Sequence, residues 1–248
     1  MTLVPNLNRA GRLAAVGLVA MLVTGCTAVP AVSPTPSPTA MPTLGPTTPP
    51  YTLAPSMAAD ACPTSAPVSY TGTATVTMTT NFGNMVIKVD GSLGANAAGA
   101  FLALSRCGYY NNIIFHRVVP GFVIQVGDGT YAREPNLGDA AKRGSGGPGW
   151  TIKDDKVTAA YKRGTVAIAN QGSSAPNTGN SQFFIVLSDS AFPAGTTGYS
   201  IFGNVTTGMD VADRIAAVPT GGEPATSSDT ASMPLQPIVI TGTTITTP

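Results

Sequence analysis

The sequence predicts a mainly β domain, a barrel or sandwich of about eight short strands with two helices. Residues 74–80 alternate between apolar and polar side chains with a period of two, and residues 85–89 follow after a turn as a second strand. Short apolar runs then recur between glycine, proline and asparagine residues. They lie at 113–119, 122–126, 165–169, 182–187, 200–205 and 238–245.

Two helices interrupt the predicted strands. Ala97, Phe101 and Leu104 fall on one face of a helix, and Gly108 can end it. A second helix is expected over 210–217, before the final strand.

Composition excludes several functions. Charged residues make up 10% of the chain and the net charge is +1, so nothing favours binding to nucleic acid. Three cysteines and one histidine would all be needed for a structural zinc site. We therefore expect no metal site.

Residues 1–25 are predicted to be an export signal. Basic residues precede an apolar run at 13–23, which is too short to span a bilayer. The run ends in Leu-Val-Thr-Gly-Cys at 22–26, which resembles the lipobox of bacterial lipoproteins. In that family the peptide is cleaved before the cysteine, so the resemblance implies that Cys26 carries a lipid (palmitate-type) anchor. The alternative is an ordinary secretory signal with a chance cysteine.

Residues 26–72 are predicted to be a tether and residues 73–248 the folded domain. No charged residue occurs from Thr27 to Ala59, and proline recurs there among serine and threonine. Such a segment cannot bury a core and favours extended backbone.

Cys62 and Cys107 remain once Cys26 is lipidated. An exported compartment permits a disulfide, which would close a loop of about 46 residues and add roughly 4 kcal/mol of stability. Two inert thiols are the alternative.

Two other sequence features are interpreted as structural and not as catalytic. The glycine-rich run at 144–149 lacks the lysine and the strand-loop-helix frame of a phosphate-binding loop. Asp154 and Asp155 are adjacent, which fits a solvated turn better than a catalytic pair.

Three sequence blocks resemble the cyclophilin family. The segment FHRVVPGFVIQVGD at 115–128 closely resembles the central signature of that family. The pair GTVAIAN at 164–170 and PNTGNSQFFI at 176–185 agrees in order and spacing, and YSIFGNV at 199–205 also fits. The resemblance implies a closed eight-stranded antiparallel barrel capped by two α-helices, with peptidyl-prolyl cis-trans isomerase activity and no cofactor.

The resemblance also implies roles for individual residues. Arg117 is matched to the catalytic hydrogen-bond donor to the prolyl nitrogen, Phe122 to the proline socket and Gln125 to an orienting role. His116 is expected to be structural. The residues matched to substrate binding are Val123, Ala169, Asn170, Gln182, Phe184, Phe192 and Tyr199.

The chain departs from the family pattern at several positions. Val123 stands where many members have methionine, and Val126 replaces a usual glycine. Phe192 stands where members that bind ciclosporin tightly have tryptophan, so weak drug binding is expected. Residues 131–143 resemble an insertion that could screen the groove or bind a partner.

The expected function is isomerisation of X-Pro bonds in exported proteins. We expect a monomer that is lipid-anchored at the extracytoplasmic face of the cell membrane and whose partners are proline-containing polypeptides. The alternative is a non-catalytic lipoprotein that binds proline peptides or acts as a chaperone.

Overall fold

The computed structural model describes residues 51–54, 62–172, 174–221 and 232–246. The predicted signal peptide at 1–25, the lipidation site Cys26 and most of the predicted tether lie outside these residues. None of the helices in the described ranges is both long and apolar enough to cross a bilayer.

Eight strands form one antiparallel sheet in the order β3-β4-β6-β5-β7-β2-β1-β8. They are β1 (Thr73–Thr80), β2 (Gly83–Asp90), β3 (Arg117–Val119), β4 (Val123–Val126), β5 (Thr165–Ile168), β6 (Phe183–Val186), β7 (Ile201–Thr207) and β8 (Ile240–Thr246). The mainly β class is confirmed, and each strand overlaps a segment that the sequence predicts. Before β3, Ile113 and Ile114 make only isolated bridges, to Arg133 and Val239.

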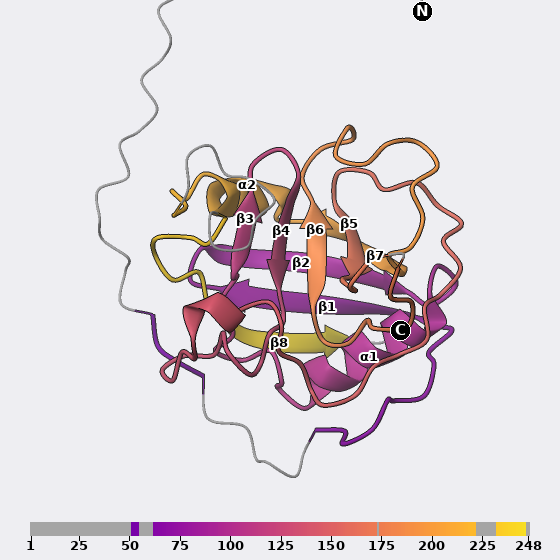
Figure 1. Ribbon diagram of the computed structural model, residues 1–248, viewed down its shortest axis with the longest axis horizontal. Helices are drawn as coiled ribbons and strands as arrows, with labels where there is room; N and C mark the ends of the chain where they lie inside the picture. The colour runs from indigo at the N-terminus through magenta and orange to yellow at the C-terminus, as the bar shows by residue number, and fades with distance from the viewer. Residues whose placement is uncertain (1–50, 55–61, 173, 222–231, 247–248) are drawn as a thin grey trace, which may run out of the picture. The chain divides into compact units, whose positions relative to one another are not determined.

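The sheet curls so that two groups of strands face each other. In Figure 1, β3, β4, β6 and β5 run upright in front of β7, β2, β1 and β8, which run across behind them. Closure of the barrel is not confirmed, because within the described ranges no ladder joins the edge strands β3 and β8. The segments ahead of these strands do meet, since Phe115 N–H donates to the Ile238 carbonyl at 2.9 Å. The described sheet is an open, curled half-barrel.

The core fills the space between the two groups of strands. Along β1 every second side chain is buried, including Val76 and Met78. The ring of Phe101 lies 5.2 Å from that of Phe183 and 4.7 Å from that of Phe202. This aromatic cluster fixes the helix that carries Phe101 against strands β6 and β7.

Helix α1 (Ala95–Arg106) ends as the sequence predicts. Gly108 has a φ of 75°, a conformation that favours glycine. Its N–H donates to the Ser105 carbonyl at 3.2 Å, and Tyr109 N–H donates to the Leu104 carbonyl at 2.9 Å. These two bonds are the Schellman motif, which satisfies carbonyls that the helix end would otherwise leave open.

The start of α1 is capped from a distant loop. Asp155 accepts hydrogen bonds from the N–H groups of Asn96, at 3.1 Å, and Ala97, at 2.9 Å. A carboxylate there also interacts favourably with the positive end of the helix dipole. Asp155 is therefore a capping residue, which the interpretation as a solvated turn missed.

Helix α2 (Met209–Ala216) lies at the opposite end of the front strands from α1 (Figure 1). Its apolar side chains Val211, Ala212 and Ile215 are buried. The two helices therefore pack their apolar faces at the two ends of the sheet.

The chain ahead of β1 also packs on the domain. The side chains of Tyr51 and Leu53 lie against the core. Cys62 is joined by a disulfide to Cys107 at the end of α1, at a sequence separation of 45 residues. A loop of that length corresponds to about 4 kcal/mol in the chain-entropy account. The folded unit thus extends upstream of the predicted boundary at Thr73.

Candidate functional site

Three neighbouring strands bring the predicted catalytic residues into one row. Arg117 on β3 lies opposite Gln125 on β4, and Gln125 lies opposite Phe184 on β6. Side chains at opposed positions project from the same face of a sheet. The intervening residues Val118 and Ile124 project from the other face and are fully buried. Because side chains alternate between the two faces of the sheet, these strands place the predicted catalytic residues on one face and core residues on the other.

A series of polar side chains links Arg117 to the glycine-rich loop. Arg117 Nη1 donates to Gln125 Oε1 at 3.4 Å, and Gln125 Nε2 donates to Gln182 Oε1 at 3.1 Å. Gln182 Nε2 donates in turn to the carbonyls of Gly144 and Gly146, each at 2.8 Å. Because 3.4 Å is long for a hydrogen bond, the first contact orients the guanidinium but binds it weakly.

The loop itself is held by the fully buried carboxylate of Asp128. Its Oδ1 accepts from the N–H groups of Thr130 and Tyr131, at 2.9 and 2.8 Å. Its Oδ2 accepts from the N–H groups of Gly144 and Gly146, at 2.8 and 3.1 Å. A Cβ atom at position 146 would lie 2.1 Å from the carboxylate oxygen, so the loop needs glycine there.

Aromatic side chains form an apolar socket beside the guanidinium. Phe184 is buried at its base, and Phe122 and Phe192 are partly exposed. The ring of Phe192 lies 5.0 Å from that of Phe122 and 5.7 Å from that of Phe184. The guanidinium carbon of Arg117 lies 5.6 Å from the Phe122 ring centroid. The socket therefore places a cation at the edge of an apolar surface.

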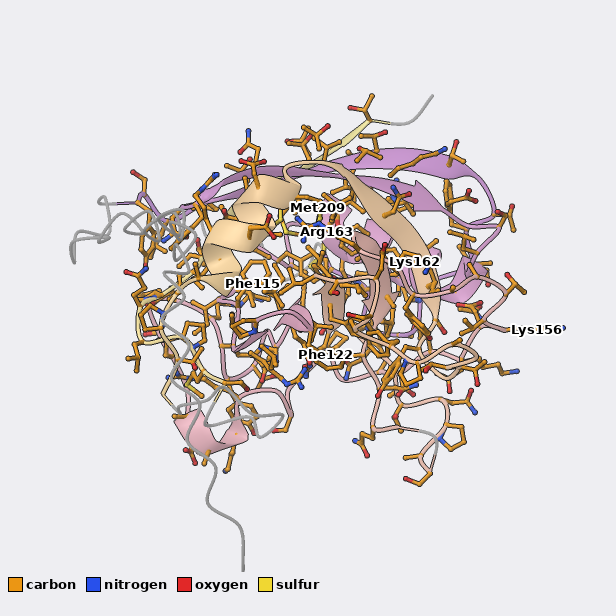
Figure 2. All side chains as sticks on the ribbon, turned by 90° about the horizontal axis from the view of Figure 1, so that it is seen from above. Phe115, Phe122, Lys156, Lys162, Arg163 and Met209 are labelled. Atoms are coloured by element: carbon orange, nitrogen blue, oxygen red, sulfur yellow. A yellow bond between two sulfur atoms is a disulfide. The ribbon has the colours of Figure 1, made fainter. Side chains whose placement is uncertain are left out.

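These residues surround a cavity of about 290 Å³. Its lining residues are Arg117, Phe122, Val123, Gln125, Gly144, Ala169, Asn170, Phe184, Phe192 and Tyr199. All the predicted catalytic and substrate-binding residues except Gln182 thus line one cavity, and Gln182 accepts a hydrogen bond from Gln125. Figure 2 shows Phe122 on the side of the domain away from β1 and β2. His116 is buried outside this lining.

Asp154 holds the part of the cavity wall that is formed by Ala169 and Asn170. Its carboxylate accepts from Asn170 Nδ2 at 3.3 Å and from Asn177 N–H at 2.8 Å. The neighbouring Ala169 donates its own N–H to the Gln182 carbonyl at 2.9 Å. Asp154 therefore positions the wall.

Tyr161 supports the socket and was not predicted from the sequence. Its buried hydroxyl donates to the Tyr199 carbonyl at 2.7 Å and accepts from the Tyr199 N–H at 3.0 Å. Its ring lies 4.7 Å from that of Phe192. Burial raises the pKa of Tyr161 to about 12. A single tyrosine ahead of a strand carries no pattern that would have revealed this role.

The insertion predicted at 131–143 is anchored to the domain. Arg133 donates to the carbonyls of Tyr109 and Asn111, and its guanidinium carbon lies 5.3 Å from the Tyr109 ring centroid. Tyr131 at its start donates its N–H to Asp128, and Arg143 at its end directly precedes the glycine-rich loop. The insertion therefore ends at the segment that supplies Gly144 to the cavity lining.

Replacing Asp128 with asparagine should loosen the glycine-rich loop. The amide has one acceptor oxygen, so two of the four backbone N–H groups lose their partner. Hydrogen bonds to a charged group are worth about 1.5–3 kcal/mol each, and we expect a loss of about 3 kcal/mol of unfolding free energy. Denaturant unfolding measures that loss, and amide hydrogen exchange should quicken at one of the two pairs, Thr130 and Tyr131 or Gly144 and Gly146. Unchanged exchange at all four amides would contradict the role given to Asp128.

Tyr161 should make the domain sensitive to alkali. An unfolded tyrosine ionises near pH 10, whereas the folded Tyr161 has a pKa of about 12. Its contribution to stability is therefore complete below about pH 10 and is lost as the pH rises from 10 to 12. Urea unfolding across this range should show a smaller alkaline loss in Tyr161→Phe than in the wild type. Equal losses would show that the hydroxyl is not buried as described.

The chain is similar to proteins of known family. The family model described as cyclophilin type peptidyl-prolyl cis-trans isomerase/CLD matches residues 75–245. A peptidyl-prolyl cis-trans isomerase of Acinetobacter baylyi is 36% identical over 169 residues, which cover 66% of this chain and 81% of that relative. Peptidyl-prolyl cis-trans isomerase-like 1 of Aspergillus oryzae is 34% identical over 152 residues, covering 60% and 85%.

A solved structure is similar over the same region. The crystal structure of a cyclophilin-type isomerase from Cryptosporidium parvum superposes with a TM-score of 0.59 at 31% identity, covering 71% of this chain and 99% of that one. A second structure of the same protein, obtained in the presence of the dipeptide Ala-Pro, superposes with a TM-score of 0.58. With the family match across 75–245, these similarities show that the chain belongs to the cyclophilin family of peptidyl-prolyl cis-trans isomerases.

Proposed function

We propose that this isomerase accelerates X-Pro isomerisation in exported polypeptides by a hydrogen bond from Arg117 to the prolyl nitrogen. One observation carries the proposal: the guanidinium of Arg117 and the aromatic socket line the same cavity of about 290 Å³. Among the described residues that line this cavity, Arg117 is the one that carries a charge. A cavity with one cation beside an apolar pocket suits a neutral peptide with a proline ring.

The chemistry needs a donor at the prolyl nitrogen. Rotation about an X-Pro bond breaks amide conjugation, against a barrier of about 20 kcal/mol. As conjugation is lost, the nitrogen regains a lone pair that can accept a hydrogen bond. A guanidinium placed there binds the twisted state more strongly than the planar ground state, which is the condition for catalysis.

The socket holds the proline ring on one side of the X-Pro bond while the residue on the other side rotates. Phe122 and Phe184 would pack on the proline ring and exclude water, and Gln125 would keep the guanidinium aimed at the nitrogen. An acceleration of about 10⁵ corresponds to roughly 7 kcal/mol, which one charged hydrogen bond, orientation and desolvation can supply together. The Ala-Pro dipeptide used with the similar Cryptosporidium protein supports this substrate class.

The location at the extracytoplasmic face of the membrane is a second part of the proposal. The lipobox-like run at 22–26 would place a lipid on Cys26, and the proline-rich segment after it would serve as a tether. The disulfide between Cys62 and Cys107 supports an oxidising compartment outside the cytoplasm.

Replacing Arg117 with alanine should lower kcat/KM for a short X-Pro peptide by at least about tenfold, or about 1.4 kcal/mol of transition-state stabilisation. Arg117→Lys should recover little, because an ammonium lacks the planar fork that Gln125 orients. The exposed Arg106 on α1 offers a matched control, and Arg106→Ala should keep full activity. Isomerisation kinetics of the folded variants measure all three effects.

The outcomes separate the two candidate functions. Turnover that survives Arg117→Ala unchanged would refute the catalytic role of this arginine. A folded wild type that accelerates no X-Pro peptide but still binds one would favour the non-catalytic peptide-binding lipoprotein.

Replacing Cys26 with serine should release the chain from the membrane. Expressed in a bacterial host, the wild type should incorporate radiolabelled palmitate and partition into detergent, and Cys26→Ser should do neither. Cys62→Ser is the matched control and should stay anchored. Palmitate incorporation by Cys26→Ser equal to that of the wild type would contradict the lipid anchor.

A further inference from the structure

Two more cavities continue the groove beyond the proline socket. The second has a volume of about 300 Å³ and shares Gly144 and Asn170 with the first. The third has a volume of about 480 Å³ and shares Ser145 and Asn180 with the second. Shared lining residues mean that the three cavities adjoin in series, with the glycine-rich loop along all of them.

The third cavity has the chemistry of a site for uncharged polypeptide. The aromatic side chains of Tyr131 and Trp150 line it together with the small residues of the loop, and none of the described residues that line it is charged. Aromatic rings suit an apolar side chain of a bound peptide. The backbone groups of Gly146 and Gly147 are already bonded within the protein, so the rings supply the recognition. The Lys142 ammonium lies 5.9 Å from the Tyr131 ring centroid and is a charge that a ligand at this ring would meet.

The walls of this cavity are held in place before any ligand binds. The Trp150 indole N–H donates to the Pro63 carbonyl at 3.0 Å, which anchors one wall to the segment ahead of β1. Tyr131 N–H is held by Asp128 at 2.8 Å, and the Tyr131 carbonyl accepts from Gly138 N–H at 3.0 Å. A wall that is already ordered lowers the entropy lost on binding.

We propose that the third cavity is a subsite for a large apolar or aromatic side chain several residues away from the isomerised proline, on the same polypeptide. The continuity of the three cavities supports a single occupant that runs from the proline socket to Trp150. The proposal rests on the proposed function, because the socket sets which segment enters the groove. A subsite there makes extended, unfolded chains better substrates than short peptides. The insertion at 131–143 then has a role, because it supplies Tyr131 to the subsite.

The order of the three cavities along the groove makes the proposal more specific. Of these three cavities, the third shares lining residues with the second and none with the proline socket, so the second lies between them. An extension of the peptide at one end only, amino or carboxyl, therefore reaches Trp150. A general affinity for apolar sequence would respond to extension at either end.

Trp150 provides a direct signal, because it is the one tryptophan in the chain and does not line the proline socket. The full chain would be titrated with a short X-Pro peptide, with peptides extended by several residues at either end to include phenylalanine, and with glycine-serine extensions of equal length. We expect one phenylalanine extension to change Trp150 emission and to lower KM about tenfold. The short peptide and the glycine-serine extensions should leave emission unchanged.

Two variants connect the signal to the site. Tyr131→Ser should abolish most of the gain from the extension and keep the turnover of the short peptide. Val68→Ala, which alters an apolar side chain that is 88% exposed and outside all three cavities, should keep both. The wild-type emission change needs no variant, so the test holds even if Tyr131→Ser folds poorly.

Failure of the subsite proposal and failure of the proposed function would give different results. If the short peptide turns over but neither phenylalanine extension changes emission or KM, the subsite is refuted and the isomerase proposal stands. Equal gains from extensions at both ends would also refute it. If no peptide turns over, the proposed function itself fails.

Discussion

The buried carboxylate of Asp128 is the interaction on which the functional face depends. Its two oxygens accept four backbone N–H groups, two from Thr130 and Tyr131, where the insertion begins, and two from the glycine-rich loop. A charge buried without such partners would be costly, so the carboxylate and the loop conformation stabilise each other. Two segments with little regular structure thereby become a rigid wall.

That wall orients the reactive groups through Gln182. The side-chain amide of Gln182 is fixed by two loop carbonyls, and its oxygen then fixes Gln125, which contacts Arg117. Each link is a single hydrogen bond of modest strength, but an arginine with several rotatable bonds gains a preferred direction from the series. In this chain the cyclophilin scaffold thus positions the flexible Arg117 side chain by two contacts. One is the hydrogen bond to Gln125, and the other is the contact of the guanidinium with the Phe122 ring.

Local patterns predicted much of the fold, and long-range contacts explain what they missed. The period of two along β1 and the glycine at 108 predicted a strand and a helix end, because both are set by nearby residues. The row from Arg117 to Phe184 followed from a family resemblance and fits the strand registers. The roles of Asp155, Asp128 and Tyr161 depend on partners brought close by tertiary packing. No spacing in the sequence encodes such contacts, and barrel closure likewise depends on how far the sheet curls.

The disulfide between Cys62 and Cys107 also decides how the domain bears mechanical load. A pull on the chain upstream of Cys62 passes through covalent bonds into the end of α1, which the aromatic cluster packs against the sheet. Residues 63–106, including β1 and β2, lie inside the covalent loop and carry none of that tension. The folded domain can therefore be held by its amino-terminal segment under force without β1 being peeled from between β2 and β8.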